Sequence, residues 1–161
     1  MDSKNKRESS ACFTGHRHIN EYTPEQLSAK IRDTVERLID IGITDYYAGG
    51  ALGFDMIAAI TVINMKKEYP QLRLYLALPC KDHNAMWNAR DKALFKRVLD
   101  RADGSVLVTD KSYAPGCMQI RNRYMVDRSS VCIAYLTRGG SGTGNTVRYA
   151  HQNGLEIINL A

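Results

Sequence analysis

Short apolar runs alternate along the chain with longer segments whose apolar residues recur at helical spacing. Six of the runs have the length of strands: residues 11–15, 45–50, 72–79, 105–109, 131–136 and 155–160. Because these runs are apolar almost throughout, rather than at every second position, they indicate strands that are covered on both faces.

The segments between the runs have a helical pattern. They cover residues 24–42, 52–69, 83–103 and 118–129, and a last helix begins between Thr143 and Thr146. In the first segment Leu27, Ile31 and Leu38 fall on one helical face. Strands that alternate with helices are typical of βαβ units. We therefore predict an α/β fold, a Rossmann-like three-layer sandwich with a mainly parallel sheet.

The chain has 161 residues, enough for one core, and no linker or repeat divides it. We predict a single Rossmann-like domain over residues 11–161, preceded by a disordered polar tail over residues 1–10. No apolar run approaches the ~18 residues of a membrane span, and none follows the tail as a secretory signal would. We expect a cytoplasmic protein without membrane contact, whose four cysteines, none in a CxxC pair, stay reduced.

Three glycine-rich segments follow strands of the predicted sheet. They are TGHR (14–17), GGALGFD (49–55) and RGGSGTGNT (138–146). The carboxyl ends of parallel strands lie at one edge of a sheet, and ligands of such folds bind beyond that edge. The three segments therefore predict one ligand site.

The segment RGGSGTGNT leads into the last predicted helix. Glycines let the backbone approach a ligand, and the unpaired amides and the dipole at a helix N-terminus favour an anion. The segment matches neither the full P-loop nor the full dinucleotide-binding motif, and a flexible turn with a Thr or Asn cap is the alternative. We expect a phosphate to contact residues of this segment: Gly140, Ser141, Gly142, Thr143, Gly144, Asn145 and Thr146.

The other two loops and the helix before the fifth strand supply further candidates. Asp55 is placed either to hydrogen-bond a ribose hydroxyl or to cap its helix, and Arg17 is placed to pair with phosphate. The remaining candidates are Gly15, His16, Gly49, Gly50, Arg121 and Asn122. No Cys, His or Asp at ligand spacing accompanies the HRH sequence, so we expect no metal site.

The net charge of +5 permits an anionic partner. The basic residues are dispersed, however, with no run of five or more and no stripe of basic and aromatic residues on which a nucleic-acid strand would stack. Nucleic acid is therefore a less expected partner than a small phosphate-bearing molecule.

Two long stretches, GALGFDMIAA and RNRYMVDRSSVCIAYLTRGGSGTGNTVRYAHQNGLEIINL, resemble the superfamily shared by DprA/Smf and the Lonely Guy proteins. The resemblance extends from Cys12 to Leu160. With TGHR, Trp87 and Tyr113 the chain looks most like the small YpsA/YoqJ-like branch. The resemblance implies a Rossmann-like fold, a pocket for a nucleotide-type ligand and, often, a homo-oligomer.

The Lonely Guy enzymes use an arginine before the fifth strand and a glutamate after a PGGxGT loop to cleave a base from a ribose monophosphate. Arg121 matches that arginine, and RGGSGT matches the loop with Arg138 in the place of proline. Thr146 stands where the glutamate would be. The resemblance thus carries over the phosphate-binding half of the site better than the catalytic half, and Arg121 and Asp55 are the catalytic candidates.

Three functions remain open. The first is binding of a nucleotide or nucleotide-derived phosphate, such as AMP, NAD or an ADP-ribose-like compound, with no cofactor certain. The second is hydrolysis of a nucleotide N-glycosidic bond. The third is interaction with single-stranded DNA or with a protein.

Overall fold

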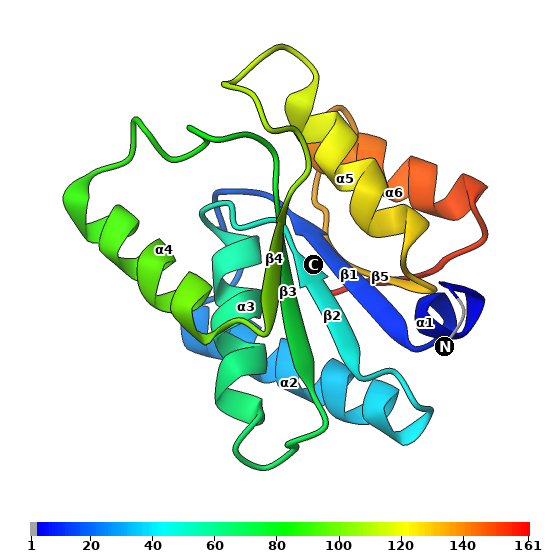
Figure 1. Cartoon of the computed structure of the whole chain (residues 1–161). Helices are drawn as coiled ribbons and strands as arrows, with labels where there is room; N and C mark the ends of the chain where they lie inside the picture. The colour runs from blue at the N-terminus through cyan, green and yellow to red at the C-terminus, as the bar shows by residue number, and fades with distance from the viewer. Residues whose placement is uncertain (1–2) are drawn as a thin grey trace.

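The computed structural model describes residues 3–161, with side chains from Lys6 onward. Its sheet consists of β1 (Ser10–Gly15), β2 (Asp45–Ala48), β3 (Arg73–Leu78), β4 (Gly104–Leu107), β5 (Val131–Tyr135) and β6 (Glu156–Asn159). The strands lie in the order β4-β3-β2-β1-β5-β6, and every pairing is parallel. The chain therefore builds the sheet outward from β1 to β4 and then returns to the other side of β1 with β5 (Figure 1).

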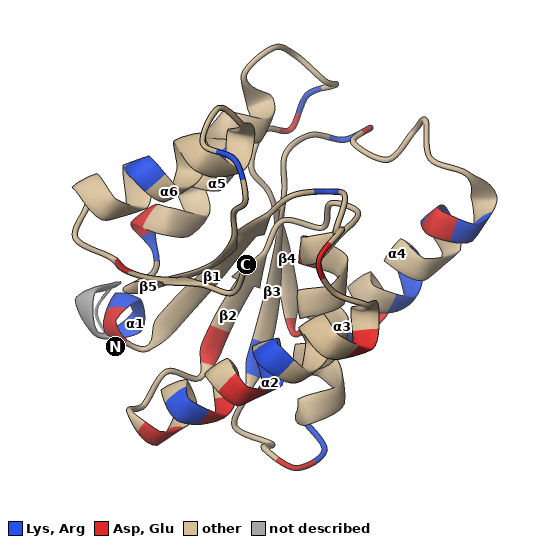
Figure 2. Ribbon diagram, turned by 180° about the vertical axis from the view of Figure 1, so that it is seen from behind, with Lys and Arg blue, Asp and Glu red and all other residues tan. Residues whose placement is uncertain are grey.

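The helices are α1 (Ser3–Glu8), α2 (Pro24–Asp40), α3 (Phe54–Met65), α4 (Ala89–Arg101), α5 (Cys117–Asp127) and α6 (Gly142–Gln152). Helices α2, α3 and α4 cover one face of the sheet, and α5 and α6 cover the other (Figures 1 and 2). The prediction of an α/β Rossmann-like sandwich with a parallel sheet is confirmed.

Local sequence explains where the best-defined helix begins. Thr23 caps α2: its hydroxyl accepts from the Gln26 backbone N–H, and the Gln26 side chain accepts from the Thr23 N–H. Pro24 follows at the first helical position, where its missing N–H costs nothing. The buried face of α2 then carries the apolar residues of the predicted stripe.

Helix α3 lies in the middle of its layer and is apolar on most sides, since α2 and α4 flank it and the sheet lies beneath. Its first residue, Phe54, stacks on Tyr135 of β5 with ring centroids 6.1 Å apart. Gly15, at the end of β1, lies against the Phe54 ring, and a Cβ at this position would overlap it. Gly15 is thus required by packing under the site.

The structure differs from the sequence prediction at three places. Of the tail expected to be disordered over residues 1–10, residues 3–8 form α1 and Ser10 begins β1, while residues 1–2 lie outside the described residues; Arg7 donates to the carbonyls of Ser129 (3.1 Å) and Asn153 (3.1 Å). The last helix, expected to begin between Thr143 and Thr146, begins at Gly142. The helix expected over 83–103 begins only at Ala89, where Asn88 accepts from the Asp91 N–H at 2.8 Å.

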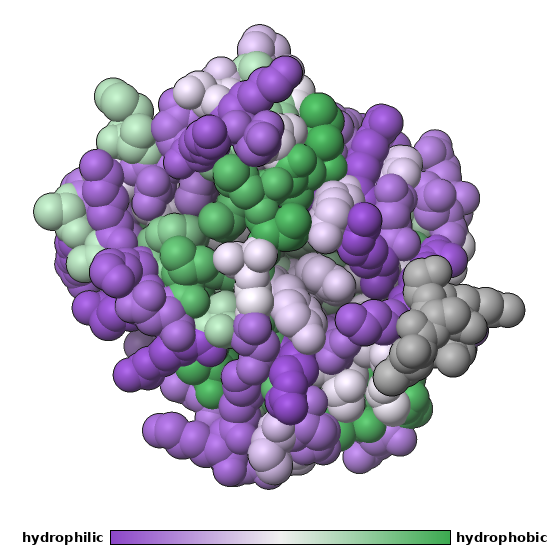
Figure 3. Space-filling model, viewed as in Figure 1, coloured by the Kyte–Doolittle hydropathy of each residue, from purple (hydrophilic) through white to green (hydrophobic). Residues whose placement is uncertain are grey.

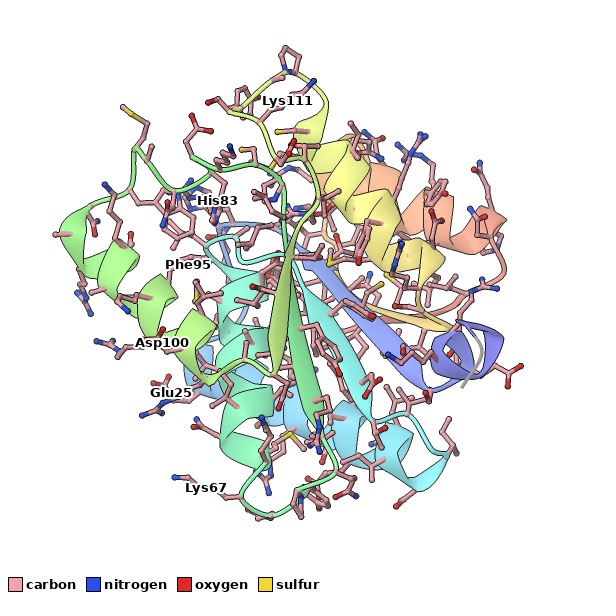
Figure 4. All side chains as sticks on the ribbon, in the orientation of Figure 1. Glu25, Lys67, His83, Phe95, Asp100 and Lys111 are labelled. Atoms are coloured by element: carbon pink, nitrogen blue, oxygen red, sulfur yellow. The ribbon has the colours of Figure 1, made fainter. Side chains whose placement is uncertain are left out.

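The segment before α4 is held by aromatic contacts instead of helical hydrogen bonds. His83 lies 4.9 Å from Phe95 and 5.5 Å from Trp87, measured between ring centroids. Figure 4 shows His83 and Phe95 side by side between α4 and the upper end of the sheet. Residues 83–87 therefore form turns that let these side chains meet.

The face of the sheet that α5 and α6 cover is less completely covered near its β4 edge. Apolar surface is visible in Figure 3 where β4 and α5 lie, and Leu107, Met118 and Ile120 are among the exposed large apolar residues. Within residues 3–161 no helix is long and apolar enough to cross a membrane.

Candidate functional site

A pocket of about 260 Å³ lies beside the carboxyl ends of β1 and β5. This is where the strand order reverses, the position at which open α/β sheets bind ligands. Nine of the residues predicted for the site line the pocket: Gly15, His16, Arg17, Asp55, Arg121, Asn122, Ser141, Gly142 and Thr143. They come from the three predicted loops and from α5.

The N-terminus of α6 presents free amides to the pocket. Ser141 is the cap: its hydroxyl accepts from the Gly144 N–H at 3.1 Å and donates to the Arg138 carbonyl at 3.0 Å. The backbone N–H groups of Gly142 and Thr143 have no acceptor among the residues that the structure describes. Unpaired amides at a helix N-terminus have the geometry and the dipole that favour an anion.

His16 links two of the loops. Its Nε2 accepts from the Thr137 N–H at 3.0 Å, while its carbonyl accepts from the Phe54 N–H at 3.2 Å. Burial lowers the pKa of this histidine, the positive charge of Arg138 lowers it further, and Glu21 opposes both. The neutral imidazole is therefore favoured, and it is the form whose Nε2 can accept the bond from Thr137.

Arg121 is almost fully buried, and its donors serve mainly the protein itself. Nη1 donates to the carbonyls of Gly49 and Ala77, and Nε donates to Asn122 Oδ1 at 2.8 Å. Nη2 has only the weak contact with Met118 Sδ at 3.7 Å among the described residues. Arg121 thus fastens α5 to the ends of β2 and β3, and Nη2 is the donor left for a ligand.

Asp55 is the one carboxyl group that lines the pocket. Burial raises its pKa to about 6, whereas the charge of Arg121 and hydrogen bonds from the Ala51 and Gly49 amides act in the opposite direction. The cap of α3 is Gly53, which makes no side-chain capping bond. Asp55 therefore accepts hydrogen bonds from the loop after β2.

Three lining residues were not among the predicted site residues: Thr14, Ala51 and Arg138. Arg138 could have been found, because it replaces the proline of the resembling loop at a strand end. Arg17 and Arg138 are exposed on the loops of this edge, which carry basic segments in Figure 2. With Arg121 they give the pocket three cationic side chains against one carboxyl group.

Six predicted residues do not line the pocket: Gly49, Gly50, Gly140, Gly144, Asn145 and Thr146. Gly49 lies against the Arg121 guanidinium, and Gly144 lies against the Gly139 carbonyl, so a side chain at either position would overlap these groups. The Thr146 hydroxyl donates back to the Gly142 carbonyl at 3.0 Å. Gly49, Gly144 and Thr146 therefore contact the protein itself and do not face the pocket.

No group of three or more His, Cys, Asp or Glu side chains is placed to hold a metal ion in the described part of the chain. The four cysteines are buried and unpaired. The chemistry that the pocket offers is therefore that of arginines, free amides, hydroxyls and one carboxyl group.

The fold and the pocket define a Rossmann-like α/β domain with a loop-built site at the switch point of its sheet. The chain belongs to the YpsA family, described as the YspA SLOG family, whose model matches residues 13–154. The resemblance found in the sequence is thereby confirmed.

Two relatives illustrate the family. The SPbeta prophage-derived protein YoqJ of Bacillus subtilis (strain 168) is 32% identical over 137 residues, 75% of this chain and 80% of YoqJ. A UPF0398 protein of Bacillus pumilus (strain SAFR-032) is 27% identical over 111 residues, 68% of this chain and 60% of that protein.

Solved structures of DNA processing protein A share the fold. The Helicobacter pylori protein, which has a single-stranded DNA binding mode, superposes with a TM-score of 0.66 at 19% identity, covering 96% of this chain and 66% of its own. The Streptococcus pneumoniae protein superposes with a TM-score of 0.68 at 14% identity, covering 93% and 49%. At such identities the likeness shows the fold alone.

Proposed function

We propose that the chain binds a nucleotide or a nucleotide-derived phosphate ligand at the carboxyl edge of its sheet. The observation that carries the proposal is the pair of free amides of Gly142 and Thr143 at a switch-point pocket with three arginines. Amides and guanidinium groups are the donors with which proteins bind phosphate. AMP, NAD and ADP-ribose are compounds of the expected class.

Thermal unfolding with these three compounds and inorganic phosphate tests the proposal. A ligand at about 100 times its Kd stabilises the native state by about 2.7 kcal/mol, which raises the Tm of a domain of this size by several degrees. A Tm that none of the four compounds raises would contradict the proposal.

Two glycines provide a matched pair of variants. A Cβ at Gly142 or at Gly140 would meet no atom within 4 Å, but only Gly142 lines the pocket. We expect Gly142→Val to abolish the ligand-induced rise in Tm and Gly140→Val to keep it. Equal loss in both variants would place the phosphate elsewhere on the loop.

A hydrolase is a second candidate, because Asp55 lines the pocket with a pKa raised to about 6. A carboxyl group of this pKa suits general acid or base catalysis near neutral pH. Release of free base from a nucleoside monophosphate, followed by chromatography, tests it. We expect Asp55→Asn to stop release while ligand binding persists; no release by the native chain would exclude the activity.

Interaction with single-stranded DNA is favoured by one specific finding, the structural likeness to the Helicobacter pylori protein. Fluorescence anisotropy with a labelled oligothymidylate at low salt tests it directly. Binding that is displaced by mononucleotide would place DNA and nucleotide in one site.

A further inference from the structure

A second pocket adjoins the pocket proposed to bind phosphate, which is called the phosphate pocket below. The second pocket lies beside α3 and α4. It measures about 390 Å³, and its floor is apolar: Leu52, Met56, Ile57 and Leu94. Its polar side chains include Arg17, His18 and the carboxyl group of Asp91, which lies in the first turn of α4. Figure 2 shows the α3 and α4 face from the front.

The two pockets meet at Arg17, which lines both. The backbone of Arg17 lies directly on Gly53, where a Cβ would overlap the Arg17 carbonyl, and Gly53 has φ +88°. Gly53 thus lets the loop after β1 lie flat on α3. Arg17, which lies on Gly53, is therefore the boundary that the two pockets share.

Together the two pockets are large enough for a ligand that uses both. Pockets for small molecules commonly measure about 300–1,000 Å³. The phosphate pocket alone falls below this range, at about 260 Å³. With the adjoining 390 Å³ the combined space is well inside the range and suits a molecule with an anionic and an apolar half.

The side chains that line the second pocket indicate which kind of group the apolar half of such a ligand would be. A flat heterocycle can lie on the floor formed by Met56 and Leu94, and the planar groups of Arg17 and His18 at the rim can stack on it. The Asp91 carboxylate has no hydrogen-bond partner for its oxygens among the described residues, and it accepts only from N–H or O–H groups.

A guanine-type base presents two adjacent N–H donors on one edge, which match a carboxylate. Adenine presents one amino group beside ring nitrogens that are acceptors and repel a carboxylate. We propose that the second pocket binds the base of a nucleotide whose phosphate occupies the first, and that Asp91 selects a base with adjacent N–H donors. This inference rests on the proposed phosphate site.

Isothermal titration with GMP, AMP and ribose 5-phosphate tests the inference. We expect GMP to bind about tenfold or more tightly than AMP, because hydrogen bonds to a charged acceptor are strong. Asp91→Asn should remove this preference, because an amide can pair with adenine as well as with guanine. Binding of ribose 5-phosphate should be the same in the native chain and in Asp91→Asn.

Asp100→Asn is the matched control. Asp100 lies on the same helix, is exposed and pairs with Lys96 at 3.2 Å, outside the pocket (Figure 4). We expect it to keep the native preference for GMP.

The outcomes separate the two proposals. If ribose 5-phosphate binds but GMP and AMP bind equally, the phosphate site stands and the base selection by Asp91 is overturned. If none of the three compounds binds, the phosphate site is overturned and the inference falls with it.

Discussion

The ionised form of Asp55 lowers the stability of the native state. The residue is 6% exposed, and burial raises the pKa of its carboxyl group to about 6 in spite of Arg121 and two backbone amides. A folded-state pKa above the unfolded value of about 3.8 means that the ionised group destabilises the native state, fully above pH 6 and not at all below pH 4.

Asp55→Asn should therefore stabilise the chain at neutral pH. Asparagine keeps an oxygen for the Gly49 and Ala51 amides but carries no charge to desolvate. We expect the free energy of unfolding of the variant to exceed that of the native chain by about 1–3 kcal/mol at pH 8, falling toward zero at pH 4. Urea unfolding at both pH values measures it; a gain that is independent of pH would contradict the assigned cause.

His16 gives a pH dependence of the opposite sign. Because its folded-state pKa lies below the ordinary value, the unfolded chain takes up the proton first as the pH falls below about 6.5. Protonation also removes the acceptor of the Thr137 N–H. Acidification from pH 7.5 to pH 5 should thus cost stability through His16.

His16→Gln isolates this effect, since the glutamine oxygen can accept from Thr137 but does not titrate. We expect the native Tm to fall more than the variant Tm between pH 7.5 and pH 5, with His83 and Asp55 contributing equally to both. Parallel Tm curves would show that His16 does not control this pH range.

At the scale of the elements, the start of α6 depends on a close approach between backbones. Gly144 lies against the Gly139 carbonyl, whereas Gly140 has open space at its Cβ position. We expect Gly144→Ala to lower the free energy of unfolding by about 1–3 kcal/mol and Gly140→Ala to change it by less than about 0.5 kcal/mol. Equal urea midpoints for the two variants would contradict this description of the loop.

Most elements could be predicted because their apolar patterns are local. The sheet strands are apolar runs, and α2 has a stripe, a capping box and Pro24. Helix α1 and the turns before α4 could not be predicted, because they depend on distant partners: Arg7 binds the Ser129 carbonyl, and His83 packs on Phe95.

The candidate site shows the same limit. Parallel topology alone brings the three loops to one edge, so residues such as Arg17, Arg121 and Ser141 could be predicted to meet. The sequence does not tell a glycine that faces a ligand from one that faces the protein. Gly49 makes room for the guanidinium of Arg121, a residue 72 positions away. The extent of the second pocket likewise depends on how α4 lies on α3.

At the scale of the whole molecule, the switch point between β1 and β5 gathers charge that the sequence disperses. The net charge is +5, yet three arginines and two free amides meet at one pocket. This arrangement suits a compact anion more than a long strand. The homo-oligomer implied by the family resemblance stays a prediction.

Salt dependence distinguishes a compact anion from a strand. Binding of single-stranded DNA lowers log K by about 0.7 per neutralised phosphate for each unit of log salt, because condensed counterions are released. A mononucleotide carries no condensed counterions, so salt changes its affinity only by screening the charges. Between 50 and 200 mM salt we expect nucleotide affinity to fall less than about fivefold.

The affinity for oligothymidylate should fall more steeply with salt. In Arg138→Ala the slope of log K against log salt should decrease by the equivalent of about one phosphate contact. Equal, steep slopes for both ligands would mean that the pocket is one part of a longer nucleic-acid surface.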